Sequence, residues 1–99
     1  MKIIQVVPRR SNKLSMKTLL VQKERELRGS STFVRQRAGR WLHKRYKGWI
    51  KWSEVSGGIL VVEVQSRAED TEWQLLRAFI GYLDRHFSDQ IESVTIIYR

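Results

Sequence analysis

The chain has 99 residues, which is the length of one domain, so we expect a single domain over residues 1–99. It contains no cysteine and two histidines, which excludes disulfide scaffolds, thiolate metal sites and a cysteine nucleophile, so we expect neither a metal nor a cofactor. The formal net charge of +9 indicates polyanionic partners, and no apolar run approaches the ~20 residues of a membrane span, so we expect a cytoplasmic protein without a membrane partner.

The first half of the chain contains a predicted strand, a predicted helix and a basic segment. Residues 2–7 hold four Ile and Val, which suits a central strand, and Pro8 ends the strand because proline cannot donate to a strand ladder. Residues 14–28 are rich in good helix formers and contain no Gly or Pro, so we expect a helix there. The basic segment at 32–47 has no clear period, and helix, strand and loop all stay open for it.

The clearest local pattern is a hairpin in the middle of the chain. Two β-rich runs flank Ser56-Gly57-Gly58, and paired glycines adopt the positive φ angles of a tight turn without strain. The first arm, residues 49–55, has mixed polarity on its faces, which is typical of an edge strand. The second arm, residues 59–66, is apolar on both faces apart from Glu63, which is typical of a central strand.

Residues 70–87 form the most regular predicted helix. Acidic side chains gather at residues 69–72, where the positive end of a helix dipole favours them. The apolar residues cover about half of the helical wheel, a wider arc than the ~100° with which a surface helix covers a core. We therefore expect the margin formed by Leu75 and Tyr82 to contact a partner. Residues 91–98 follow with an alternating pattern that predicts a terminal strand.

Without the basic segment, the predicted elements follow the order βαββαβ. This order is typical of the ferredoxin-like arrangement, an α+β two-layer sandwich in which the first and third strands are central and both helices cover one face of the sheet. The two most apolar predicted strands, 2–7 and 59–66, are the ones that this topology makes central. The alternative is a ββαβ core with an extended basic N-terminal region.

The chain contains no motif of catalysis or of phosphate-loop binding. GxxxxGK[ST], GxGxxG, GxSxG and HExxH are all absent, and the glycine pair joins two predicted strands rather than a strand and a helix. His43 lies among basic neighbours that offer no carboxylate to orient it, and His86 lies near the end of a predicted helix. The charge of Glu63 in a predicted central strand indicates that its side chain lies on the open face of the sheet, forms an ion pair or belongs to a functional site. We therefore expect a protein that is not an enzyme.

Cations and aromatic rings alternate in the more basic half of the chain. Residues 1–53 hold 15 Lys and Arg against two acids, a net +13, whereas residues 54–99 hold four against eight, a net −4. Lys and Arg neutralise phosphates, and Trp rings stack on unpaired bases without reading their sequence. We expect a surface for single-stranded or non-specific nucleic-acid binding, formed by Arg35, Arg37, Arg40, Trp41, Lys44, Arg45, Lys47, Trp49, Lys51 and Trp52. The alternative places the three Trp residues in a core or an interface.

Three stretches of the chain resemble small proteins carried on bacterial mobile elements, of the integron-cassette and prophage type. They are GWIKW through EVQS, EWQLLRAFIGYLDRHF and the terminal IIYR. The resemblance carries over no site residue and implies a stand-alone accessory protein that binds nucleic acid or inhibits another protein. The alternative function is therefore a protein-interaction or inhibitory module that acts as a homodimer without nucleic-acid binding.

A homodimer is also expected on physical grounds. A ferredoxin-like sheet has helices on one face only, so apolar side chains on its other face must meet solvent, a ligand or a second subunit. A symmetric pair of chains is the simplest arrangement that covers such a face.

Overall fold

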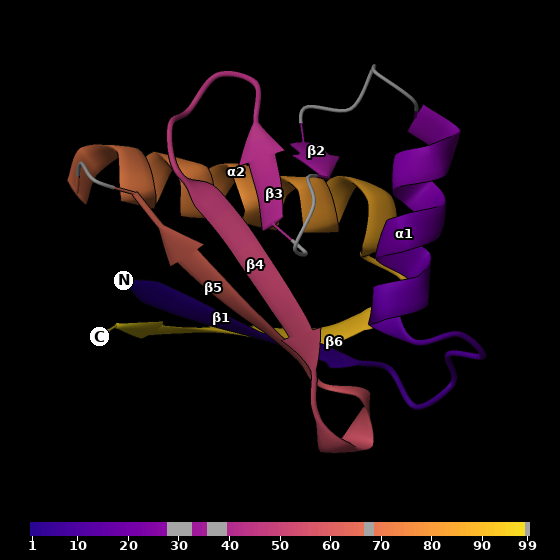
Figure 1. Ribbon diagram of the computed structural model, residues 1–99. Helices are drawn as coiled ribbons and strands as arrows, with labels where there is room; N and C mark the ends of the chain where they lie inside the picture. Colours follow the sequence, from indigo (N-terminus) through magenta and orange to yellow (C-terminus); the bar gives the residue numbers. More distant parts are fainter. Residues whose placement is uncertain (28–32, 36–39, 67–68, 99) are drawn as a thin grey trace.

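The computed structural model describes residues 1–27, 33–35, 40–66 and 69–98, which form an α+β protein (Figure 1). Within these residues, two α-helices and a short 3-10 helix at Ser56–Gly58 accompany one six-stranded antiparallel sheet. The α-helices are α1 (Met16–Leu27) and α2 (Glu69–Phe87), and the strands are β1 (Lys2–Pro8), β2 (Phe33–Arg35), β3 (Arg40–His43), β4 (Trp49–Glu54), β5 (Leu60–Gln65) and β6 (Ile91–Tyr98). The helices and strands predicted outside the basic segment are confirmed to within two residues at each end. No described helix has the length and apolar character of a membrane span.

The strands follow the order β2-β3-β4-β5-β1-β6 across the sheet, and all neighbouring pairs are antiparallel. β1 and β5 are central, as expected from their Ile and Val content. Ile4 of β1 lies opposite Val62 of β5 on one side and Ile96 of β6 on the other. Branched apolar side chains pack well when a strand has neighbours on both sides, which explains why the two most apolar strands lie side by side in the interior of the sheet.

The prediction that residues 49–55 lie at the edge of the sheet is wrong, because the basic segment supplies two further strands. Arg40 and Trp41 of β3 pair with Lys51 and Ile50 of β4, and β2 pairs with β3. β4 therefore lies between β3 and β5. Its mixed polarity has another cause. Ile50 is fully buried in the core, whereas Lys51 points to the opposite face and is exposed.

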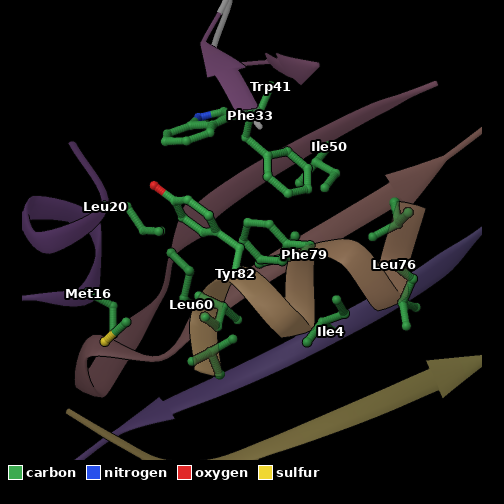
Figure 2. Packing of buried hydrophobic residues seen from close by; sticks show 14 of the residues in the cluster. Ile4, Met16, Leu20, Phe33, Trp41, Ile50, Leu60, Leu76, Phe79 and Tyr82 are labelled. Atoms are coloured by element: carbon green, nitrogen blue, oxygen red, sulfur yellow. The ribbon is translucent and has the colours of Figure 1, made fainter. Parts of the chain in front are cut away.

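Both helices contribute to a hydrophobic core on one face of the sheet. Ile4, Ile50 and Leu60 lie on this face and are buried together with Leu20 of α1 and Phe79 of α2 (Figure 2). We call the other side of the sheet the open face. Its exposed residues include Lys51, Ser53, Gln65, Ser93 and Thr95.

The margin of α2 formed by Leu75 and Tyr82 is buried within the chain, so the prediction that it contacts a partner is wrong. Leu75 is fully buried and Tyr82 is 6% exposed. The ring of Phe33, which comes from β2, lies 5.5 Å from the ring of Tyr82 and 5.5 Å from that of Phe79 (Figure 2). The strands of the basic segment thus extend the sheet over the wide apolar arc of α2. Among the described large apolar side chains of α2, Trp73 is the exposed one, at 40%.

A side-chain hydrogen bond determines where α1 begins, and two glycines allow the turn between β4 and β5. The hydroxyl of Ser15 accepts a 3.2 Å hydrogen bond from the backbone N–H of Thr18, an N-cap that explains why α1 begins at Met16 rather than at residue 14. Between β4 and β5, Gly57 and Gly58 have φ angles of 82° and 76°. Glycine enters this left-handed region without strain, and the predicted hairpin is confirmed.

Candidate nucleic-acid interface

A cation and an aromatic ring of the basic half meet on the open face of the sheet. The guanidinium of Arg40 lies over the indole of Trp49, 4.6 Å from the ring centroid. Arg40 and Lys51 are cross-strand neighbours on β3 and β4, and both are exposed. Like charges that lie opposite each other are unfavourable in a sheet, whereas the ring face of Trp49 attracts a cation. Arg40 and Trp49 therefore form one composite surface.

These two residues line an open hollow of about 710 Å³ near the point where β5 leads into α2. Its lining residues come from β3, from the loop before β4 and the start of β4, from the end of β5 and the residue after it, and from the first turn of α2. The lining consists of Arg40, Lys47, Gly48, Trp49, Gln65, Ser66 and Thr71. We call this site the Arg40–Trp49 hollow. Its cations, hydroxyls and indole ring are the groups with which proteins contact phosphates and stack on bases.

Gly48 determines how closely the loop before β4 approaches β5. Its φ of 115° lies in the region that side-chain-bearing residues rarely adopt. A Cβ at this position would overlap the carbonyl oxygen of Gln65 and would lie 3.1 Å from Cδ2 of Leu75. The floor of the Arg40–Trp49 hollow therefore requires glycine at this point.

His43 holds the loop that carries three of the predicted cations. Its Nδ1 accepts hydrogen bonds from the backbone N–H groups of Arg45, at 2.9 Å, and Tyr46, at 3.2 Å. The His43 ring also stacks on the Tyr46 ring, with centroids 4.8 Å apart. Burial, and to a smaller extent the charge of Arg45, lowers the pKa of His43, which favours the neutral ring that can accept these bonds. Its role here is structural, and Lys44, Arg45 and Lys47 share the loop that it stabilises.

Most of the predicted interface residues lie in the region of β3, β4 and the loop between them. The exposed cations are Arg40, Lys44, Arg45, Lys47 and Lys51. Arg35 belongs to β2, and Arg37 lies outside the described residues. Of the predicted residues, Arg40, Lys47 and Trp49 line the hollow itself. Its other lining residues, Gly48, Gln65, Ser66 and Thr71, did not emerge from the sequence, although a glycine directly before a strand was an available signal.

The three predicted Trp residues separate into two environments. Trp41 is fully buried in the core, so its ring faces no solvent and it leaves the candidate surface. Trp52 packs partly buried against the same core, 6.0 Å from Trp41 between ring centroids. Trp49 is half-buried and borders the hollow. The reason is strand alternation, since Trp41 and Trp52 share the face of Ile50 and Trp49 has the opposite one.

Glu63 and the two histidines form no catalytic arrangement with other residues in the part of the chain that the structure describes. Glu63 lies half-buried on the open face, opposite Lys51 of β4, and no ion pair involving it occurs among the described residues. The ring of His86 contacts that of Tyr82, with centroids 4.8 Å apart, and its pKa is lowered first by burial and then by the charges of Lys23 and Arg85. The described residues include no cluster of His, Asp and Glu able to hold a metal ion.

Comparison with known protein families, curated proteins and solved structures finds no match for this chain. The geometry of its surface is therefore the basis on which its function is inferred.

Proposed function

We propose that this protein is not an enzyme and that it binds nucleic acid through the Arg40–Trp49 hollow and the cations around it. The nucleic acid is single-stranded, or it is bound without preference for its sequence. The observation that carries the proposal is the guanidinium of Arg40, held 4.6 Å from the indole of Trp49 at the border of a hollow that Lys47 also lines.

The charge around the hollow supports contact with phosphates. Five exposed cations lie within residues 40–51, and the sequence has no acid between Glu26 and Glu54. Each phosphate that Lys or Arg neutralises releases condensed counterions, which makes binding favourable and salt-dependent. The loop held by His43 keeps Lys44, Arg45 and Lys47 on one connected stretch of surface.

The contact between Arg40 and Trp49 supports binding to unpaired bases. A guanidinium that rests on an indole is oriented before it meets a ligand, so it loses less freedom on binding than a mobile side chain. Bases stack on aromatic rings and on the planes of arginine guanidinium groups, and such stacking tolerates every base. Arg40, oriented by Trp49, offers such a plane to a base, beside cations for the backbone.

The strand order supports the finer proposal that the fold is ferredoxin-like. The four strands β4-β5-β1-β6 follow the order of a βαββαβ unit in which the first and third strands are central. In this proposal β2 and β3 are an insertion between the first helix and the second strand of that unit. The insertion contributes Arg40 and widens the open face on which the hollow lies.

The test measures binding of fluorescently labelled single- and double-stranded DNA and RNA by anisotropy, between about 50 and about 200 mM salt. We expect at least micromolar affinity for single strands. The logarithm of the affinity should fall linearly with the logarithm of the salt concentration. Arg40→Ala is expected to weaken binding and to flatten the slope by about 0.7, the contribution of one phosphate on a single strand. Lys17→Ala, which removes an exposed cation of α1, is the control and should leave the slope unchanged.

Two results would overturn the proposal. Absence of micromolar binding to all four nucleic acids would favour the alternative of a protein-interaction module. Equal effects of Arg40→Ala and Lys17→Ala would mean that binding depends on overall charge and not on the Arg40–Trp49 hollow.

A further inference from the structure

The strand at the far edge of the sheet, β6, has a long unprotected edge. β6 pairs with β1, and in the described part of the chain no strand lies on its other side, so one row of its backbone N–H and C=O groups has no strand partner. Natural sheets protect such edges with short strands, lysine or proline. β2, at the opposite edge, has three residues, whereas β6 runs for eight residues without lysine or proline.

Apolar side chains of β6 are incompletely covered on the side of the helices. Val94 is 36% exposed and Tyr98 is 68% exposed, and Ile96 lies half-buried between them. Their register with β1 places all three on the face that carries the core. Beside Val94, a hollow of about 250 Å³ lies between α2 and β6, and its lining combines apolar residues such as Ile80 and Leu83 with the acids Asp84 and Glu92. This edge thus offers both a protruding ring and a partly apolar recess.

We propose that β6 pairs with β6 of a second copy of this chain, antiparallel about a two-fold axis at Ile96, so that the two sheets continue as one. In this register Tyr98 of each chain lies directly opposite Val94 of the other, and Ile96 lies opposite its own copy. Pairs of an aromatic and a β-branched residue are favourable across strands. Tyr98 of each copy also covers the recess beside Val94 of the other. The pairing goes beyond the proposed function and does not depend on it.

Charge favours a second copy at β6 over one at the open face. The chain has a net charge of +9, so two copies associate more readily when their cations stay apart. β6 contains one charged residue, Glu92, whereas Arg40 and Lys51 lie on the open face. In the strand order, two strands lie between β6 and β4 and three lie between β6 and β3. Pairing through β6 therefore leaves both Arg40–Trp49 hollows accessible at the far sides of the joined sheet.

Analytical ultracentrifugation of the full chain and its variants tests the pairing. The unmodified chain is expected to sediment as a dimer. Val94→Asp and Tyr98→Lys, each alone, are expected to halve the mass, because each inserts an unpaired charge into an apolar cross-strand pair. An equimolar mixture of the two variants is expected to recover the dimer, since the register brings the introduced carboxylate opposite the introduced ammonium. Melting followed by circular dichroism verifies that each variant is folded.

Val34→Asp is the matched control, because Val34 is 45% exposed, belongs to the strand at the opposite edge and lies on the open face, one residue along from the pair that Arg35 forms with the buried Trp41. We expect this variant to remain a dimer. A monomer for the unmodified chain at its highest soluble concentration would overturn the proposal. A dimer that Val34→Asp breaks and Val94→Asp preserves would overturn it in favour of the open face. Two folded variants that stay monomeric on mixing would overturn the two-fold register at Ile96.

Discussion

Nζ of Lys2 donates a 3.0 Å hydrogen bond to Oε1 of Glu72 and thereby ties β1 to α2. The N-terminal ammonium lies 3.5 Å from the same oxygen. Glu72 is only 6% exposed, so these cations replace much of the water around its carboxylate. Burial raises the pKa of Glu72, but the hydrogen bond and charge of Lys2, together with the N-terminal ammonium, outweigh burial and hold the pKa below its ordinary value of 4.5.

We expect Glu72→Gln to lower the free energy of unfolding by about 1–3 kcal/mol at neutral pH, because Lys2 keeps its burial and loses a charged acceptor. Since the pKa of Glu72 is lower in the folded state than in the unfolded state, the stabilisation is complete above about pH 4.5 and is lost as the pH falls through the folded-state value. Urea unfolding at neutral and acid pH measures both effects. The difference in free energy of unfolding between the unmodified chain and Glu72→Gln should be smaller at acid pH.

Glu26→Gln is the matched control for this pair. Lys23 and Glu26 are also 3.0 Å apart, but the side chain of Glu26 is 64% exposed. An exposed ion pair contributes less than about 1 kcal/mol, because water and salt screen it. Equal losses of stability in the two variants would contradict the role that we assign to burial.

A second prediction concerns the pH dependence of the loop between β3 and β4. Nδ1 of His43 accepts bonds from Arg45 and Tyr46 only while it is unprotonated. Burial, followed by the charge of Arg45, lowers the pKa of His43 below its ordinary value of 6.5. The stabilisation is therefore present above about pH 6.5 and is lost as the pH falls through the lower folded-state pKa.

NMR titration of the backbone amides of Arg45 and Tyr46 measures this transition. We expect both resonances to shift with the protonation of His43, and His43→Ala to abolish the shift. His86→Ala is the control, because the pKa of His86 is also lowered but its ring contacts Tyr82 and not this loop. Amide shifts that follow His86 would refute the prediction.

A third prediction separates the Trp residues by environment. Trp41→Ala is expected to lower the free energy of unfolding by about 3–5 kcal/mol, because it removes a fully buried ring from the core. Trp49→Ala is expected to cost less stability, and to weaken single-strand binding by about 1–3 kcal/mol if its ring stacks on a base. Thermal melting and anisotropy on the same variants measure the two quantities. A larger loss of stability for Trp49→Ala than for Trp41→Ala would contradict the assigned environments.

A fourth prediction compares two glycines that differ in backbone conformation. Gly48→Ala is expected to destabilise the protein by about 1–3 kcal/mol, since alanine is strained at a φ of 115° and its methyl group would overlap the carbonyl of Gln65. Gly81→Ala is expected to stabilise it by about 0.5–1 kcal/mol, because Gly81 lies within α2 with open space around it. Urea unfolding of both variants measures the two changes in stability. Destabilisation by Gly81→Ala would contradict this prediction.

Local patterns in the sequence were sufficient to predict most of the elements. A helix buries one side with a period of 3.6 residues and a strand with a period of 2, so the apolar spacing in 70–87 and 91–98 identified α2 and β6. The glycine pair at Gly57 and Gly58 marked the hairpin, because few other residues accept its backbone angles.

The tertiary structure decided which side became core and which became surface. The two short strands in the basic segment have little local signal, because β2 and β3 are stabilised by pairing with a strand that follows them in the chain. Once paired, they move β4 away from the edge and bring Phe33 over Tyr82. They also bury Trp41 and leave Arg40 beside Trp49. Alternation along a strand determines which residues share a face, whereas only the packing of the helices determines which face is covered.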